Sequence, residues 1–363
     1  MGRTNRILFF EDDSVIRDQL EIEVKKKAPN IDLIMADSDL VLELIKDRGG
    51  LAIEDTVALN ISDKFNGSQI DLIVADHDLS KLDSKLSESI ITAAAHQLAI
   101  PVCRYHRRAS SSTKTVSNWD LNSKVFAVDV ELGDEFADSL LDVMEGFKEI
   151  KEKYSAMNTS LRMKGPAAIL ANILEADGQI PHLSLYTSGV AFFNDPFIVS
   201  KNIEKSKLGN ELERRIPYVL GYWLLNVVLK FPGIILNKVA AASYLDLSFN
   251  DFSKTDLNGN FSEARYAGPF SHSKDYWWRA KLDDLLGDNE IDDFLKEKGY
   301  NEIFSHSKCS VNDKLQAGYY DIFSDKQISL EESVGQLSWV PEGADLARAE
   351  KEKYEELAPI LNL

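Results

Sequence analysis

The sequence contains few cysteines, and their placement excludes two kinds of structure. Cys103 and Cys309 are the two cysteines of the 363-residue chain, and they stand far apart. A framework of disulfides needs more cysteines, and a cysteine-based zinc site needs closely spaced ones. We therefore expect a fold that depends on neither.

The chain also lacks a long apolar run. Its most apolar segment, residues 216–229, is shorter than the ~20 apolar residues that a membrane-spanning helix needs. A buried helix is the interpretation that we favour for this segment, and a helix-turn-helix module over residues 216–249 is the alternative. No apolar leader precedes residue 7. The sequence therefore predicts a cytoplasmic protein with no membrane partner.

Basic residues are outnumbered by acidic ones. The chain has 41 Lys and Arg against 59 Asp and Glu, a formal net charge of −18. Duplex DNA is bound chiefly through Lys and Arg contacts to its phosphates, so this charge argues against a DNA-binding output. We expect no nucleic-acid partner and an output through contacts with a downstream protein.

Several motifs of catalysis and nucleotide binding are absent as well. There is no Walker loop, no glycine-rich turn after the first apolar segment, no G-x-S-x-G and no H-E-x-x-H. The histidines of the second half, His182, His272 and His306, lack neighbouring cysteines or carboxylates at the spacing of a site. We expect no enzyme activity, although an active site assembled from distant residues of the second half stays open.

What the chain does have is a pair of short apolar segments that end in carboxylates. Residues 7–10 are followed by Glu11 and Asp12, and residues 70–75 are followed by Asp76. Such segments predict strands of a doubly wound α/β domain, in which ligands gather at the carboxyl ends of parallel strands. Carboxylate oxygens suit Mg²⁺, which keeps several waters in such sites. The sequence therefore predicts a site for Mg²⁺ and phosphate.

Further segments complete a βα pattern around this pair. Ser14 is a candidate N-cap for a helix to about residue 27, and Asp37 or Ser38 is a candidate cap for the next one. Residues 87–98 are expected to be helical, and residues 49–68 to be an insertion. The five predicted strands comprise residues 7–10, 31–36, 70–75, 100–106 and 124–130.

These motifs resemble the receiver domain of bacterial two-component response regulators. Residues 7–17 are similar to the family's first strand, acidic pair and first helix, and residues 71–79 are similar to its third strand with the phosphoacceptor aspartate at the end. The resemblance covers the N-terminal part of the chain only. It implies a flavodoxin-like domain with a parallel five-stranded sheet, acting in phosphorelay signal transduction.

The resemblance also implies a role for each carboxylate. Asp76 would accept a phosphoryl group from a histidine kinase or a phosphotransfer protein, which makes the chain a phosphoprotein. Asp12 would bind Mg²⁺ directly and Glu11 through water. Asp78 would contribute its backbone carbonyl.

Two positions depart from the family pattern. At the end of the fourth strand, where the family has a switch Thr or Ser, the matching residue is His106, unless one of residues 110–112 serves. Near the end of the fifth strand, where the family has a Lys, Val128 or Asp129 stands. Loss of the Lys removes a cation, and Asp129 would repel phosphoryl oxygens. These departures favour the alternative of a pseudo-receiver, an interaction module that is never phosphorylated.

A chain of this length predicts two domains. We expect a receiver-like domain over residues 1–134, an amphipathic connector helix over residues 135–160 and a mainly helical α+β domain over residues 161–363. Residues 182–193 have strand character, and the last part of the chain predicts a small β unit. A receiver joined to a domain that does not bind DNA also resembles, in architecture, the phosphate-buffering component of the phage-defence system Detocs.

The second domain contains an aromatic cluster that ends in a cation. Trp277, Trp278 and Arg279 are of the residue types that dominate interaction hot spots, so they are a candidate interaction surface. In the alternative interpretation the tryptophans pack in the second core, and Arg279 pairs with Asp283 one helical turn later.

Overall fold

The computed structural model describes residues 4–65, 70–79, 81–106, 127–131, 133, 135–187, 208–254, 259–300 and 303–361. The chain divides into two compact units. The first unit consists of Met1–Ser112, Ser123–Ala156 and Pro196–Tyr222, and the second of Thr113–Asn122, Met157–Asp195 and Trp223–Leu363. No helix among the described residues is both long enough and apolar enough to cross a membrane.

The first unit is built on a five-stranded sheet with the order β2-β1-β3-β4-β5. All neighbouring strands are parallel. The strands are β1 (Arg6–Phe10), β2 (Asp32–Met35), β3 (Leu72–Asp76), β4 (Val102–His106) and β5 (Val128–Glu131). This is the strand order of flavodoxin-like doubly wound domains. The predicted α/β class and parallel five-stranded sheet are therefore confirmed.

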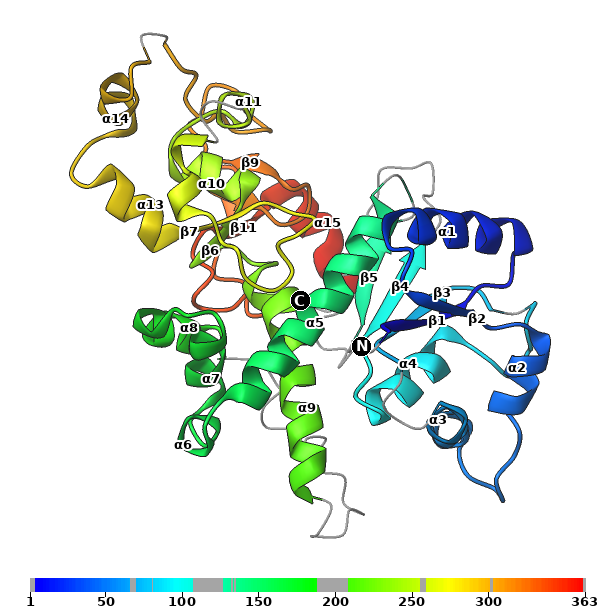
Figure 1. Cartoon of the computed structure of the whole chain (residues 1–363). Coiled ribbons are helices and arrows are strands. Elements are labelled where there is room, and N and C mark those ends of the chain that lie inside the picture. The colour runs from blue at the N-terminus through cyan, green and yellow to red at the C-terminus, as the bar shows by residue number, and fades with distance from the viewer. Residues whose placement is uncertain are drawn as a thin grey trace. The chain divides into compact units, whose positions relative to one another are not determined.

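Helices cover both faces of this sheet (Figure 1). They are α1 (Ser14–Lys27), α2 (Ser38–Leu44), α3 (Ile53–Lys64), α4 (Glu88–Gln97) and α5 (Phe136–Ala156). Because side chains alternate along a strand, Leu8 and Phe10 enter the core shared with α2, α3 and α4. Phe9 points to the other face and packs against Phe136 of α5, with ring centroids 6.4 Å apart.

Short polar side chains set where the helices begin. The Asp13 carboxylate accepts a hydrogen bond from the Val15 N–H, so the N-cap of α1 lies one residue before the predicted Ser14. Asp37 caps α2 and Ser87 caps α4 in the same way. Two helices lie between β2 and β3: α2 is the helix expected after Asp37 or Ser38, and α3 lies within residues 49–68, where the sequence predicted an insertion.

Helix α5 belongs to the first unit, which corrects the prediction of a connector that leaves it. Its amphipathic face is buried: the Phe136 ring lies edge-on to Tyr105 of β4 at 5.5 Å, and Asp138 pairs with Lys27 of α1 at 2.8 Å. The apolar stripe predicted the helix correctly, but such a stripe does not say which surface will cover it.

A helix from much later in the chain completes the first unit. Helix α9 (Leu208–Trp223) belongs to it as far as Tyr222. The Val102 N–H of β4 donates to the Tyr222 hydroxyl at 2.8 Å, and Arg215 donates to the Gln97 carbonyl at 3.0 Å. The predicted division at residue 161 thus misses a segment of the first unit, because nothing local marks a helix as the partner of a distant sheet.

The second unit contains helices and two small sheets. One sheet has the order β10-β11-β8-β9, and the other pairs β6 with β7. The strands are β6 (Ile235–Asn237), β7 (Tyr276–Trp278), β8 (Tyr319–Asp321), β9 (Lys326–Ile328), β10 (Ser333–Val334) and β11 (Ala347–Glu350). The C-terminal β unit predicted from the sequence corresponds to β8–β11.

The helical segments of the second unit are short. They are α6 (Thr159–Arg162), α7 (Pro166–Ile173), η2 (Asp177–Gln179), α8 (Ile180–Leu185), the π-helical η5 (Leu224–Val228), α10 (Lys238–Tyr244), α11 (Phe249–Phe252), η6 (Ser262–Ala264), α13 (Arg279–Leu286), α14 (Ile291–Glu297) and α15 (Lys351–Leu361). The strand character expected from residue 182 is wrong as far as Leu185, because α8 covers that part. Residues 188–193 lie outside the described chain.

Candidate functional site

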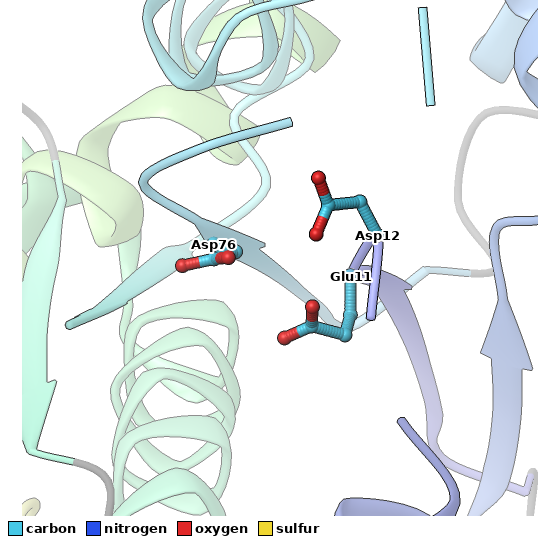
Figure 2. Close-up of side chains that lie close together, drawn as sticks. All are labelled: Glu11, Asp12 and Asp76. Carbon is cyan, nitrogen blue, oxygen red and sulfur yellow. The ribbon is translucent and has the colours of Figure 1, made fainter. Parts of the chain in front are cut away.

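The carboxyl edge of the parallel sheet brings three acidic side chains together. Glu11 and Asp12 directly follow the last residue of β1, and Asp76 is the last residue of β3. These strands are neighbours, with Phe10 opposite Ala75. One carboxylate oxygen from each acidic residue lies within 4.8 Å of the others (Figure 2). The structure thus brings together the three side chains that the sequence analysis grouped, while their roles as metal ligands and phosphoacceptor stay predictions.

The group is largely buried, which makes its charge important. Glu11 is 1% exposed and Asp76 is 5% exposed. The Asp12 side chain is 3% exposed. Carboxylates that share a site repel each other unless a cation neutralises them. All three offer hard oxygen ligands, as Mg²⁺ requires. Among the described residues, this is the one group of His, Cys, Asp or Glu close enough together to share a metal ion.

Glu11 is held in place by a tyrosine that sequence reasoning did not single out. The hydroxyl of Tyr105 donates to Glu11 Oε2, and the Asp13 N–H donates to Oε1 at 2.7 Å. Tyr105 is fully buried, and it lies opposite Asp76 in the pairing of β3 with β4. In the sequence, a tyrosine in a predicted strand indicates no more than core packing. Only the sheet register places its hydroxyl at the acidic site.

Asp76 receives a hydrogen bond from its own loop. The His77 N–H donates to Asp76 Oδ1 at 2.7 Å. The His77 ring lies 3.3 Å from a Glu88 oxygen of α4, and its side chain is 70% exposed. The imidazole is therefore mostly exposed to solvent, whereas the backbone N–H of His77 contacts the Asp76 carboxylate.

Asp12 is paired with a lysine that the sequence also gave no reason to choose. Lys81, in the loop after β3, places its Nζ 3.5 Å from Asp12 Oδ1. Its backbone N–H donates to Asp12 Oδ2 at 3.2 Å. Loop lysines are common and are usually solvated, so the spacing of Lys81 from Asp76 predicts nothing by itself. The pairing arises because β1 and β3 are adjacent strands.

The remaining predicted site residues have different outcomes. Asp78 is exposed two residues after Asp76, and metal binding by its carbonyl stays a prediction. His106 is the last residue of β4, opposite Glu131, while its side chain and residues 110–112 lie outside the described part. Asp129 does not present an unpaired charge: its Oδ1 lies 2.8 Å from Nη2 of Arg104. Arg104 thus offsets the charge of Asp129, and the repulsion of phosphoryl oxygens by Asp129 stays a prediction.

The aromatic cluster of the second unit is core and not surface. Trp277 is 0% exposed and Trp278 is 7% exposed, so neither ring is accessible to a partner. Trp277 packs edge-on against Phe252 at 5.0 Å. The alternative interpretation had expected Arg279 to pair with Asp283. Arg279 pairs instead with Asp345, at 2.7 Å. The candidate interaction surface is therefore wrong, because strand β7 buries both tryptophans.

Comparison of the sequence with protein-family models gives no match, and comparison with curated proteins gives none of significance. Function must therefore be inferred from the fold of the first unit and from the chemistry of Glu11, Asp12 and Asp76.

Proposed function

We propose that the first unit is a receiver-type phosphoacceptor and that Asp76 takes a phosphoryl group from the phosphohistidine of a kinase or a phosphotransfer protein. One observation carries this proposal. Glu11, Asp12 and Asp76 lie within 4.8 Å of one another at the carboxyl edge of a parallel sheet with the order β2-β1-β3-β4-β5. That edge is where doubly wound domains bind their ligands.

The chemistry follows from the placement of Asp76. One of its carboxylate oxygens attacks phosphorus, the phosphorus–nitrogen bond of the phosphohistidine breaks, and the imidazole leaves with the electron pair and takes up a proton. The product is an acyl phosphate on Asp76. The carboxylates of Glu11, Asp12 and Asp76 would hold Mg²⁺, which when bound offsets the charge of the phosphoryl oxygens. Tyr105 keeps Glu11 oriented throughout.

The output of the protein would run through the second unit. A net charge of −18 disfavours a grip on DNA, so a downstream protein is the partner that we propose. A cytoplasmic phosphorelay is the setting that fits this chemistry.

One observation favours the alternative function. Strand β5 consists of Val128, Asp129, Val130 and Glu131 and so carries no lysine at the site. A pseudo-receiver would keep the fold and bind partners without ever being phosphorylated.

Phosphorylation by acetyl phosphate separates the two functions. We expect intact-mass spectrometry to show one added phosphate on the wild-type chain in Mg²⁺, and none on Asp76→Asn. Asp78→Asn is the matched control, because it removes a nearby exposed carboxylate and keeps the backbone carbonyl.

An unmodified wild-type chain, with acetyl phosphate and with candidate kinases, would establish the pseudo-receiver instead. Modification that persists in Asp76→Asn would show that another residue is the acceptor.

A further inference from the structure

Lys81 stands at the acidic site in a way that differs from an ordinary surface lysine. Its backbone is fixed there, because its N–H donates to Asp12 Oδ2 at 3.2 Å. Its side chain is 66% exposed, while the Asp12 side chain that it contacts is 3% exposed. Lysine has a flexible stem and a compact ammonium group with rotatable donors. The ammonium can therefore move while the rest of Lys81 stays at the site.

The neighbouring cation on β4 is already engaged elsewhere. Arg104 lies 3.3 Å from Glu88 and 2.8 Å from Asp129. Strand β5 offers no lysine. A phosphoryl group on Asp76 would bring further negative charge next to the carboxylates of Glu11 and Asp12. Within the described part of the chain, Lys81 is a cation whose pairing with Asp12 places it where it can meet that charge.

We propose that Lys81 has two positions: it neutralises Asp12 when no metal is bound, and it yields Asp12 to Mg²⁺ and turns to the phosphoryl group on Asp76. This role rests on the proposed function of Asp76. The move of the Lys81 ammonium from Asp12 to Asp76 is short, since oxygens of these two residues lie within 4.8 Å of each other. Lys81 and the metal compete for Asp12 before transfer and act together on the phosphoryl oxygens during it.

Removal of the ammonium should therefore change two measurements in opposite directions. In Lys81→Gln, Mg²⁺ should bind about twofold to fivefold more tightly, which is the size of an exposed ion pair lost as a competitor. At saturating Mg²⁺, the rate at which acetyl phosphate labels Asp76 should fall by about tenfold or more, because a donor to the developing charge is gone. In that step, the Asp76 oxygen bonds to phosphorus and acetate leaves with the electron pair.

The experiment uses the full chain and two comparison variants. Mg²⁺ affinity is obtained from the unfolding midpoint as a function of Mg²⁺ concentration, and labelling is followed by intact mass. Lys85→Gln is the matched control, because Lys85 is an exposed lysine of the same segment and the net charge changes equally. Lys81→Arg keeps the positive charge and should restore both values most of the way.

The proposal of two positions for Lys81 is supported if Lys81→Gln shows both tighter Mg²⁺ binding and slower labelling and Lys85→Gln shows neither. Lys81→Gln behaving as Lys85→Gln in both measurements overturns them, and so does weaker Mg²⁺ binding. Tighter Mg²⁺ binding with unchanged labelling also overturns the proposal, since Lys81 would then act on Asp12 only. If the wild-type chain is never labelled, the proposed function fails and this inference fails with it. If wild type and Lys81→Gln are labelled at equal rates, only this inference fails.

Discussion

The two units both bury carboxylates, yet the neighbours of these carboxylates differ. In the first unit, Glu11 and Asp76 are 1% and 5% exposed and lie beside another carboxylate, Asp12. In the second unit, Asp321 is 0% exposed and lies among hydrogen-bond donors. Those donors are the N–H groups of Phe323, Ser324 and Glu350 and the hydroxyl of Ser324.

The difference separates a structural carboxylate from a candidate binding site. Asp321 at the end of β8 has its charge distributed over four donors, so it ties β8 to the turn after it and to β11. Buried charges of this kind are stable because their hydrogen bonds are made. The cluster of Glu11, Asp12 and Asp76 gathers like charges instead. Burial of an acidic residue is thus no sign of function, whereas burial of several acidic residues side by side favours a site that a metal cation would stabilise.

The largest expected effect tests the structural side of this comparison. In Asp321→Asn, an amide NH₂ replaces one acceptor oxygen and faces N–H donors, so the free energy of unfolding of the second unit should fall by about 3 kcal/mol. Tryptophan fluorescence during urea unfolding measures it, because Trp277 and Trp278 belong to this unit. The control is Asp284→Asn, at an exposed position. Equal midpoints for the two variants would show that the donors around Asp321 contribute little.

An Asp→Asn substitution in the acidic cluster of the first unit should change the free energy of unfolding in the opposite direction. Without metal, Asp76→Asn removes one of three neighbouring charges and keeps the carbonyl that accepts from His77, so we expect stability to rise by about 1 kcal/mol. Added Mg²⁺ should raise the calorimetric unfolding midpoint of the wild type and leave that of the variant nearly unchanged. A metal-free variant less stable than the wild type would contradict the repulsion that we infer.

The smallest effect concerns Asp251 in the second unit. Burial acts to raise the pKa of Asp251, but Lys254, the Ser305 N–H and Ser248 outweigh it and hold this pKa below its ordinary value. The folded state therefore favours the ionised carboxylate, which stabilises the protein above the unfolded pKa of about 3.9. That stabilisation is lost as the pH falls through the lower folded value.

The difference in unfolding midpoint between wild type and Asp251→Asn should accordingly be largest near neutral pH and shrink below about pH 4. Thermal unfolding at a series of pH values measures it. A difference that grows on acidification would mean that the sign of the pKa shift is wrong.

Prediction from the sequence succeeded where the signal is local. Residues 7–10 and 70–75 are short apolar runs, and both became strands of the first sheet. A helix was expected after Asp37 or Ser38 because their side chains can cap one, and Asp37 is the cap of α2. For Trp277 and Trp278 the candidate interaction surface was wrong and the alternative of core packing is confirmed. Hot-spot residues and core residues are the same residue types, so the sequence left both interpretations open and burial distinguishes them.

Some of the decisive features left no mark in the sequence. Helix α9 belongs to the first unit as far as Tyr222, although residues of the second unit precede it in the sequence. Gly221 permits the approach of α9 to α5, since a Cβ there would lie 2.3 Å from Cε1 of Phe147. Tyr105 and Lys81 reach the site from β4 and from a loop. None of these contacts joins residues that are close in sequence.

The sequence by itself determined the α/β class of the first unit and the acidic residues of its site. Strand periodicity and the position of Glu11, Asp12 and Asp76 at strand ends are properties of a few consecutive residues, which elementary sterics and solvation fix. The tertiary structure alone decided that Tyr105 holds Glu11, that Lys81 pairs with Asp12, and that Trp277 is buried. These outcomes depend on which strands become neighbours, and strand order is a property of the whole packed chain.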